Sequence, residues 1–196
     1  LLPHVPMIED AIAAVLTGQH EDDSFNQLVL FTQQEPQTIG WLRAWFRFLR
    51  QGGFLYGMDT VVGALRSAPQ LTNRLISLFR ALHDPKAADE AKAAQLQQEI
   101  EAAFADIQSI DEDRIFRLYL AVINATLRTN AFAPAAEEAL AFKLDSSLIP
   151  GLPKPLPWRE VFVYSQRVEG VHMRAGPVAR GGLRWSDRRD DFRTEV

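Results

Sequence analysis

Hydrophobic residues recur at every third or fourth position through the first two thirds of this 196-residue chain, which is the spacing of helices that bury one face. Capping residues, glycines and prolines interrupt the pattern at intervals. These signals predict helices that run from Pro6 to Gly18, from Ser24 to Thr32, from Pro36 to Gly52, from Asp59 to about Leu65, from Ser67 to Asp84, from Lys86 to Gln108 and from Ser109 to about Asn130. We therefore expect a multi-helix module over residues 1–130.

The predicted helix from Pro36 has the widest apolar surface. Leu42, Trp45, Phe46 and Leu49 form one face, with Trp41 and Phe48 on a flank. An arc this wide predicts burial on more than one side. Basic residues interleave with the aromatic ones, as in nucleic-acid-binding stripes, but the regular helical spacing favours a packed core helix.

The hydrophobic pattern changes after Asn130. Alternating apolar and polar residues predict short strands over 140–144, 161–164 and 171–174. The prolines between Ser146 and Pro157 predict an extended connection, and residues 187–196 have the pattern of a new helix. The predicted fold is mainly α, with the helical module followed by a short α/β segment over residues 131–196.

Composition and charge narrow the class of protein. Apolar residues make up 47% and charged residues 23%, as in an ordinary soluble domain, and the absence of cysteine excludes disulfides and thiolate metal sites. We see neither a membrane-spanning run nor a signal peptide, so we expect a cytoplasmic protein without membrane contact. Because the chain starts at a leucine and stops where a helix begins, we expect it to be part of a larger protein.

The net charge of −4 conceals an asymmetry. Residues 1–150 hold 12 Lys/Arg and 19 Asp/Glu, a balance of −7, whereas residues 151–196 hold 9 and 6, a balance of +3. The basic part contains a turn rich in glycine and arginine, in which Arg180 and Arg184 flank Gly181 and Gly182. Glycines let a ligand approach the backbone, and a guanidinium fork binds carboxylate or phosphate, so this Gly/Arg turn predicts an anion site.

Other interpretations of the polar residues compete with this one. The turn alone is equally compatible with an ordinary hairpin whose arginines are solvated. A single Arg-Gly-Gly in an acidic chain does not favour nucleic acid. The acidic residues 111–113 suit the first turn of a helix better than a metal site, and His172 occupies a plain strand position without a partner at ligand spacing.

The run from Val168 to Val196, with Gly176-Pro-Val-Ala-Arg-Gly-Gly-Leu-Arg-Trp185 at its centre, closely resembles the very large bacterial NAD-specific glutamate dehydrogenases. Segments 111–115, 126–130, 142–145 and 152–157 are similar to that family as well. The resemblance implies an enzyme that deaminates L-glutamate oxidatively to 2-oxoglutarate and ammonia with NAD, and it implies that residues 131–196 begin the substrate-binding domain.

The resemblance also implies roles for the turn. Smaller glutamate dehydrogenases carry a similar Gly-Pro-x-Lys-Gly-Gly-x-Arg-aromatic turn, in which the Lys reaches a carboxylate of glutamate. On this resemblance Arg180 stands at the position of that Lys. The resemblance further implies that Gly181 and Gly182 line the substrate pocket and that Arg184 supports the turn. The catalytic Lys, the catalytic Asp and the dinucleotide-binding domain would lie beyond Val196, so we expect no activity from this segment alone.

A second hypothesis treats the helices as an interaction module without its own ligand site. They would dock onto other domains of the same parent chain or onto subunits of a homo-oligomer. Exposed Trp41 and Phe48 would favour such a docking face, whereas buried ones would favour a self-contained bundle.

Overall fold

A computed structural model describes residues 5–178, 182–183 and 193 of the chain. The chain divides into two compact units: unit 1 comprises Leu1–Arg43 and Tyr56–Arg117, and unit 2 comprises Ala44–Leu55 and Leu118–Val196. The divisions fall inside helices α3 (Pro36–Gln51) and α7 (Ile110–Ala125), so each of these helices gives residues to both units.

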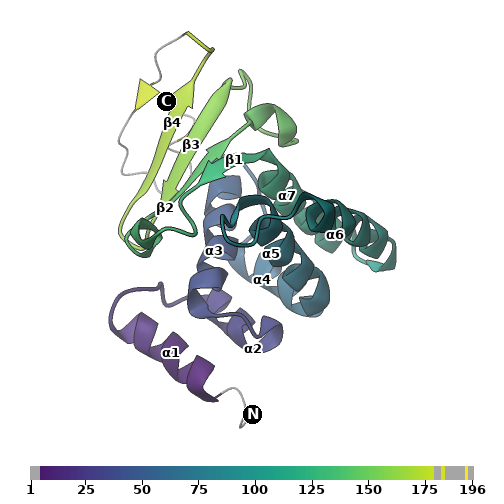
Figure 1. The fold of residues 1–196 in the computed structure, drawn as a ribbon, viewed down its shortest axis with the longest axis vertical. Coiled ribbons are helices and arrows are strands. Elements are labelled where there is room, and N and C mark those ends of the chain that lie inside the picture. Colours follow the sequence, from purple (N-terminus) through teal and green to yellow (C-terminus); the bar gives the residue numbers. More distant parts are fainter. Residues whose placement is uncertain (1–4, 179–181, 184–192, 194–196) are drawn as a thin grey trace. The chain divides into compact units, whose positions relative to one another are not determined.

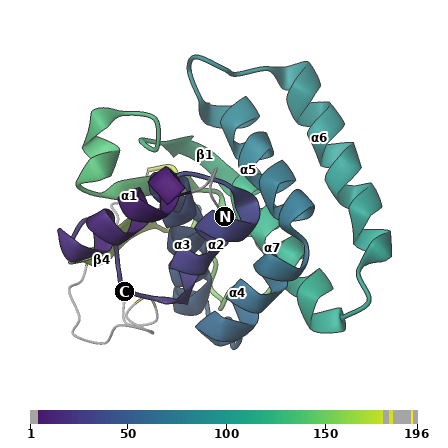
Figure 2. The same ribbon diagram turned by 90° about the horizontal axis from the view of Figure 1, so that it is seen from below.

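Unit 1 is helical. Besides the first halves of α3 and α7, it contains α1 (Val5–Leu16), the 3-10 turn η2 (Ser24–Gln27), α2 (Leu28–Thr32), α4 (Met58–Ser67), α5 (Pro69–His83), α6 (Glu90–Ala103) and η3 (Phe104–Asp106). Helices α5 and α6 lie side by side in both views (Figures 1 and 2). The core of the unit includes Trp41, whose ring centroid lies 5.1 Å from that of Phe79 on α5.

Unit 2 contains an antiparallel sheet in which every strand pairs with the next along the chain. Its strands are β1 (Thr126–Thr129), β2 (Leu140–Leu144), β3 (Arg159–Tyr164), β4 (Glu169–Arg174) and β5 (Gly182–Leu183). Short 3-10 turns, η4 (Pro134–Glu137) and η5 (Ser146–Leu148), flank β2. Directly paired residues share a face, and the buried face carries Leu140, Phe142, Leu144, Phe162, Tyr164 and Val171.

The second half of α3 belongs to the core of this unit. The ring of Phe48 lies 5.6 Å from that of Phe162 on β3, and Trp45 makes an edge contact with Tyr119 of α7. All three aromatic residues of these pairs that lie on α3 or α7 are buried. The predicted burial of the α3 aromatics is thereby confirmed.

Most predicted elements are confirmed, with a mainly helical part followed by an antiparallel sheet. The predicted end of the last helix was wrong: α7 stops at Ala125, and Thr126–Thr129 form strand β1 against β2. The carbonyl of Ala125 accepts a hydrogen bond from the Asp145 amide at 2.8 Å, so cross-strand pairing replaces the next helical turn. The predicted domain boundary near Asn130 stays a prediction.

Aspartate caps define two other helical starts. The helix predicted from Lys86 begins only at Glu90, because the Asp89 carboxylate accepts a hydrogen bond from the Lys92 amide and caps it there. The helix predicted from Ser24 begins there as the 3-10 turn η2, and the Asp23 carboxylate caps it by accepting a hydrogen bond from the Phe25 amide. In the part of the chain that the structure describes, no helix is long and apolar enough to cross a bilayer.

Candidate functional site

The sequence of the Gly/Arg turn follows β4 and includes Gly182, the first residue of β5. Met173 pairs with Gly182, and His172 pairs with Leu183. Of the four predicted site residues, Gly182 is described, whereas Arg180, Gly181 and Arg184 lie outside the described residues. The structure thus assigns one predicted residue to a strand edge and leaves the other three as predictions.

The start of the segment after β4 is held by Arg174 and Trp158. The Arg174 guanidinium donates a hydrogen bond to the Pro177 carbonyl at 2.6 Å. The backbone carbonyl of Arg174 accepts a hydrogen bond from the Trp158 backbone amide at 2.7 Å. The Trp158 ring lies 5.5 Å from the Arg174 guanidinium and 4.4 Å from that of Arg159. We call these contacts of Arg174 with Pro177 and Trp158 the brace. After the brace, Val178 is 95% exposed, so the chain lies at the protein surface where the turn begins.

Strand register sorts the residues near the turn onto two faces. Gly182, Met173 and Glu160 form one cross-strand row, on the buried face of the sheet. His172 and Val161 form the next cross-strand row, on the other face, and the backbone of Leu183 pairs with His172. His172 and Gly182 therefore lie on opposite faces of the sheet.

A buried ion pair lies on the face that includes Gly182. The Arg193 guanidinium contacts both carboxylate oxygens of Glu160, with Nε to Oε1 at 2.8 Å and Nη2 to Oε2 at 3.0 Å. The Ser146 hydroxyl donates a third hydrogen bond to Oε2 at 3.1 Å. Glu160 and Ser146 are fully buried and Arg193 nearly so, which makes this a charge-assisted, desolvated contact.

A second buried carboxylate, Glu169 on β4, is held from α3. It accepts hydrogen bonds from Nε of Arg47 and from the Gln51 side-chain amide, the latter at 3.3 Å. The side-chain carbonyl of Gln51 accepts from the backbone amide of Arg193 at 3.3 Å. Gln51 therefore joins the two ion pairs into one buried polar cluster, formed by Arg47, Gln51, Ser146, Glu160, Glu169 and Arg193.

This buried polar cluster anchors the surroundings of the Gly/Arg turn. It holds β3 through Glu160, β4 through Glu169, and the chain after the turn through Arg193. None of the motifs or periodic patterns in the sequence predicted this cluster. A glutamate at an inward position of an alternating strand, as at Glu160, was the available signal.

The acidic residues at the start of α7 have structural partners. Asp113 pairs with Arg117 four residues later at 2.8 Å, and Asp111 accepts a hydrogen bond from the Tyr56 hydroxyl. Within residues 5–178, 182–183 and 193, no three His, Asp or Glu side chains gather in a way that could hold a metal ion. Trp41 and Phe48, which would have been exposed on a docking face, are 4% and 1% exposed.

Both family models and individual relatives show similarity between this chain and known proteins. Residues 99–196 match the family model "Bacterial NAD-glutamate dehydrogenase, catalytic domain", and residues 20–85 match "Glutamate dehydrogenase, helical motif 3". The chain is 45% identical over 195 residues to the NAD-specific glutamate dehydrogenase of Mycobacterium tuberculosis. It is 42% identical to the enzymes of the same name from Halomonas elongata and Pseudomonas aeruginosa.

The alignments cover 95–97% of this chain but only 12% of each of these relatives. The catalytic-domain match contains the five strands that the structure describes and the whole sequence of the Gly/Arg turn. The chain therefore belongs to the family of bacterial NAD-glutamate dehydrogenases, and its sheet lies in the part that matches their catalytic domain.

Proposed function

We propose that this chain is a segment of an NAD-specific glutamate dehydrogenase, which converts L-glutamate to 2-oxoglutarate and ammonia. The observation that carries the proposal is the catalytic-domain match over residues 99–196. NAD supplies the hydride chemistry when it is bound by other parts of the enzyme, and this segment contributes to binding the substrate. By itself the segment is expected to be inactive. We also propose that the enzyme acts in the cytoplasm as a homo-oligomer.

The proposed substrate contact is the Gly/Arg turn. Arg180 binds a substrate carboxylate through its guanidinium fork, Gly181 and Gly182 leave room for the ligand next to the backbone, and Arg184 supports the turn. Two features support this assignment: the brace at Arg174 and Trp158 holds the chain before the turn, and the buried polar cluster holds it afterwards.

The test of the reaction is formation of reduced nicotinamide by the full-length enzyme in the presence of L-glutamate. We expect activity with NAD and much less with NADP. If no amino acid supports reduction of either cofactor, the proposed reaction is wrong.

The test of the site compares Arg180→Ala with Arg167→Ala in that enzyme. Arg167 is an exposed arginine in the β3–β4 turn of the same sheet, so its removal controls for the loss of one positive charge. Losing a charge-assisted hydrogen bond to the substrate should lower kcat/KM about 10- to 100-fold for Arg180→Ala. Arg180→Lys should retain more activity, because it keeps a cation in the turn. If Arg180→Ala is as active as Arg167→Ala and the wild type, Arg180 does not bind the substrate.

A further inference from the structure

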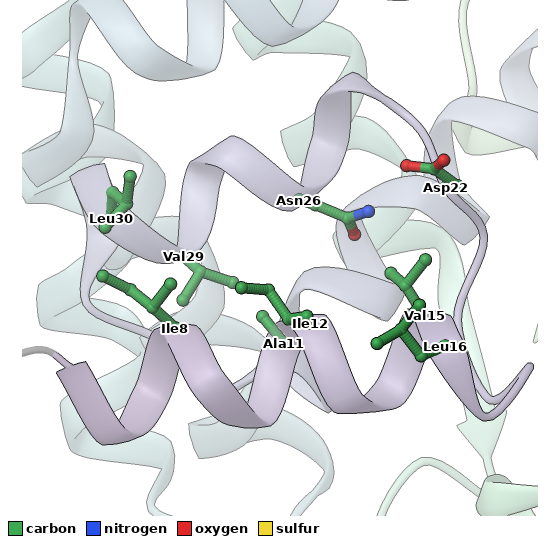
Figure 3. A pocket seen from close by; sticks show the side chains of 9 residues that line it. All are labelled: Ile8, Ala11, Ile12, Val15, Leu16, Asp22, Asn26, Val29 and Leu30. Carbon is green, nitrogen blue, oxygen red and sulfur yellow. The ribbon is translucent and has the colours of Figure 1, made fainter.

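An open groove lies between helices α1 and α2 on the surface of unit 1. Its volume is about 310 Å³. One face of α1 lines it with Ile8, Ala11, Ile12, Val15 and Leu16, and the following segment contributes Asp22, Asn26, Val29 and Leu30. Asp22 lies toward the end formed by Val15 and Leu16, and Leu30 toward the Ile8 end (Figure 3).

The lining of this groove is unusually apolar for a surface. Ile12 is 54% exposed, Leu16 81% and Leu30 44%, and Ala14 is the single buried residue of α1. An amphipathic helix normally turns its apolar stripe toward a partner surface. Contiguous exposed apolar side chains of this kind mark a contact site more often than scattered ones do.

The surroundings of the groove are acidic, which favours a basic partner. The first 42 residues contain no Lys or Arg, and the first basic residue, Arg43, is buried in an ion pair with Asp23. Asp22 lines the groove, and Glu9 lies on the flank of α1 beside Ile12 by helical spacing. A second copy of the same acidic surface would be repelled, whereas a partner that carries Lys or Arg beside an apolar stripe is attracted.

The shape of the groove suits a helix. Its α1 side runs two turns, from Ile8 to Leu16, or about 12 Å along the axis. A docked amphipathic helix fills such a groove with side chains spaced three, four and seven residues apart. This chain spans 12% of its relatives' length, so most of a polypeptide of that length lies outside this chain and provides further segments for the groove.

We propose that the α1/α2 groove binds an amphipathic helix with flanking Lys or Arg residues, supplied by another part of the same polypeptide. The contact joins the helical part of this chain to the rest of the enzyme. It is independent of the reaction proposed above, since no residue of the Gly/Arg turn takes part.

The experiment places a photo-crosslinking amino acid at position 12 of the full-length polypeptide. A matched variant carries it at position 110, where Ile110 is 86% exposed outside the groove. After illumination, mass spectrometry identifies the crosslinked peptides. A mixture of isotopically light and heavy chains separates links within one chain from links between two copies. We expect links from position 12 to an apolar, Lys- or Arg-bearing segment of the same chain.

Two further variants test the chemistry of the contact. Leu16→Asp keeps an exposed position exposed in the free unit, and should reduce the crosslink yield at least about tenfold, the loss expected when a buried leucine is exchanged for a charge. Asp22→Lys should reduce it too, through repulsion of the basic flank. Links between light and heavy chains, links to another protein, or a yield no higher than at position 110 would each overturn the proposal.

Discussion

At the scale of single residues, the buried charges stand out because each is held by a specific partner. Glu160 has no solvent exposure, and its carboxylate is satisfied by Arg193 and Ser146. In unit 1, Arg43 is likewise buried and binds both carboxylate oxygens of Asp23 at 2.7 and 2.8 Å. A buried ion that loses its partner costs more than the pair itself contributes.

The Glu160–Arg193 pair gives a direct test. Glu160→Gln preserves the shape of the side chain but leaves the Arg193 guanidinium buried without an anion. We expect the free energy of unfolding to fall by about 3 kcal/mol, measured by urea denaturation. Glu138→Gln, at an exposed position before β2, is the control and should change it by less than about 0.5 kcal/mol. Equal effects of the two substitutions would contradict the assigned role of the pair.

His20 gives unit 1 a pH dependence. Burial, followed by the nearby positive charge of Arg43, lowers the pKa of His20 below its ordinary value of 6.5, while Asp23 partly opposes the shift. The unfolded chain therefore binds this proton more readily than the folded one. The stability associated with neutral His20 is complete above pH 6.5, falls as the pH drops below that value, and levels off below the folded pKa.

The prediction is checked by following the urea midpoint from about pH 7.5 to about pH 5 for the wild type and His20→Gln. The wild type should lose more stability than the variant over this range. Parallel curves for the two proteins would show that His20 does not carry the effect.

At the scale of elements, the C-terminus of α3 shows how local chemistry ends a helix. The Gly53 amide bonds to the Arg50 carbonyl and the Phe54 amide to the Leu49 carbonyl, each at 3.0 Å, which is the Schellman arrangement. Gly53 has a φ of 84°, in the left-handed region that glycine adopts without strain. The helix therefore ends where a residue without a side chain permits the reversal.

Two glycine substitutions separate backbone strain from available space. A Cβ at Gly53 meets nothing within 4 Å, yet Gly53→Ala should lower the free energy of unfolding by about 1 kcal/mol because φ is positive. Gly63→Ala, also in open space but inside α4, should raise it by about 0.5–1 kcal/mol. Urea denaturation measures both, and a stabilising Gly53→Ala would contradict the strain argument.

Some helices and strands could be predicted from the local pattern of apolar and polar residues, and others could not. Strands β2, β3 and β4 and the helix from Pro36 followed from periodicity and punctuation. The segment Thr126–Thr129 did not, because its apolar spacing continues that of α7 and its strand geometry depends on pairing with β2. Of the candidate site, the substrate role of Gly182 stays a prediction, although the structure pairs this residue with Met173 of β4, while the cluster that anchors this region was missed.

At the scale of the whole molecule, family segments and compact units do not coincide. The catalytic-domain match begins at residue 99, inside α6, whereas residues 56–117 belong to the helical unit 1. Unit 1 therefore includes residues from both family matches. The boundaries of compact units and the boundaries of segments that match a sequence family can therefore fall at different positions in a chain.

Stability should vary strongly between helices of unit 1. Helix α5 buries Leu71, Thr72, Leu75, Ile76, Leu78, Phe79 and Ala81, whereas α1 buries Ala14 alone. In amide hydrogen exchange of the 196-residue chain, α1 should exchange fastest and α5 slowest among the helices that lie wholly in unit 1. Protection of α1 equal to that of α5 would contradict this ranking.

Within the described residues, the sequence by itself determined most of the helices and the strands β2, β3 and β4, and it also determined the family, because these depend on local periodicity and on short motifs. Only the tertiary structure decided how the buried charges pair. Arg47 meets Glu169 across 122 positions, and Arg193 meets Glu160 across 33. Such partners leave no periodic trace in the sequence, since their proximity arises from strand register and from the packing of α3 within unit 2.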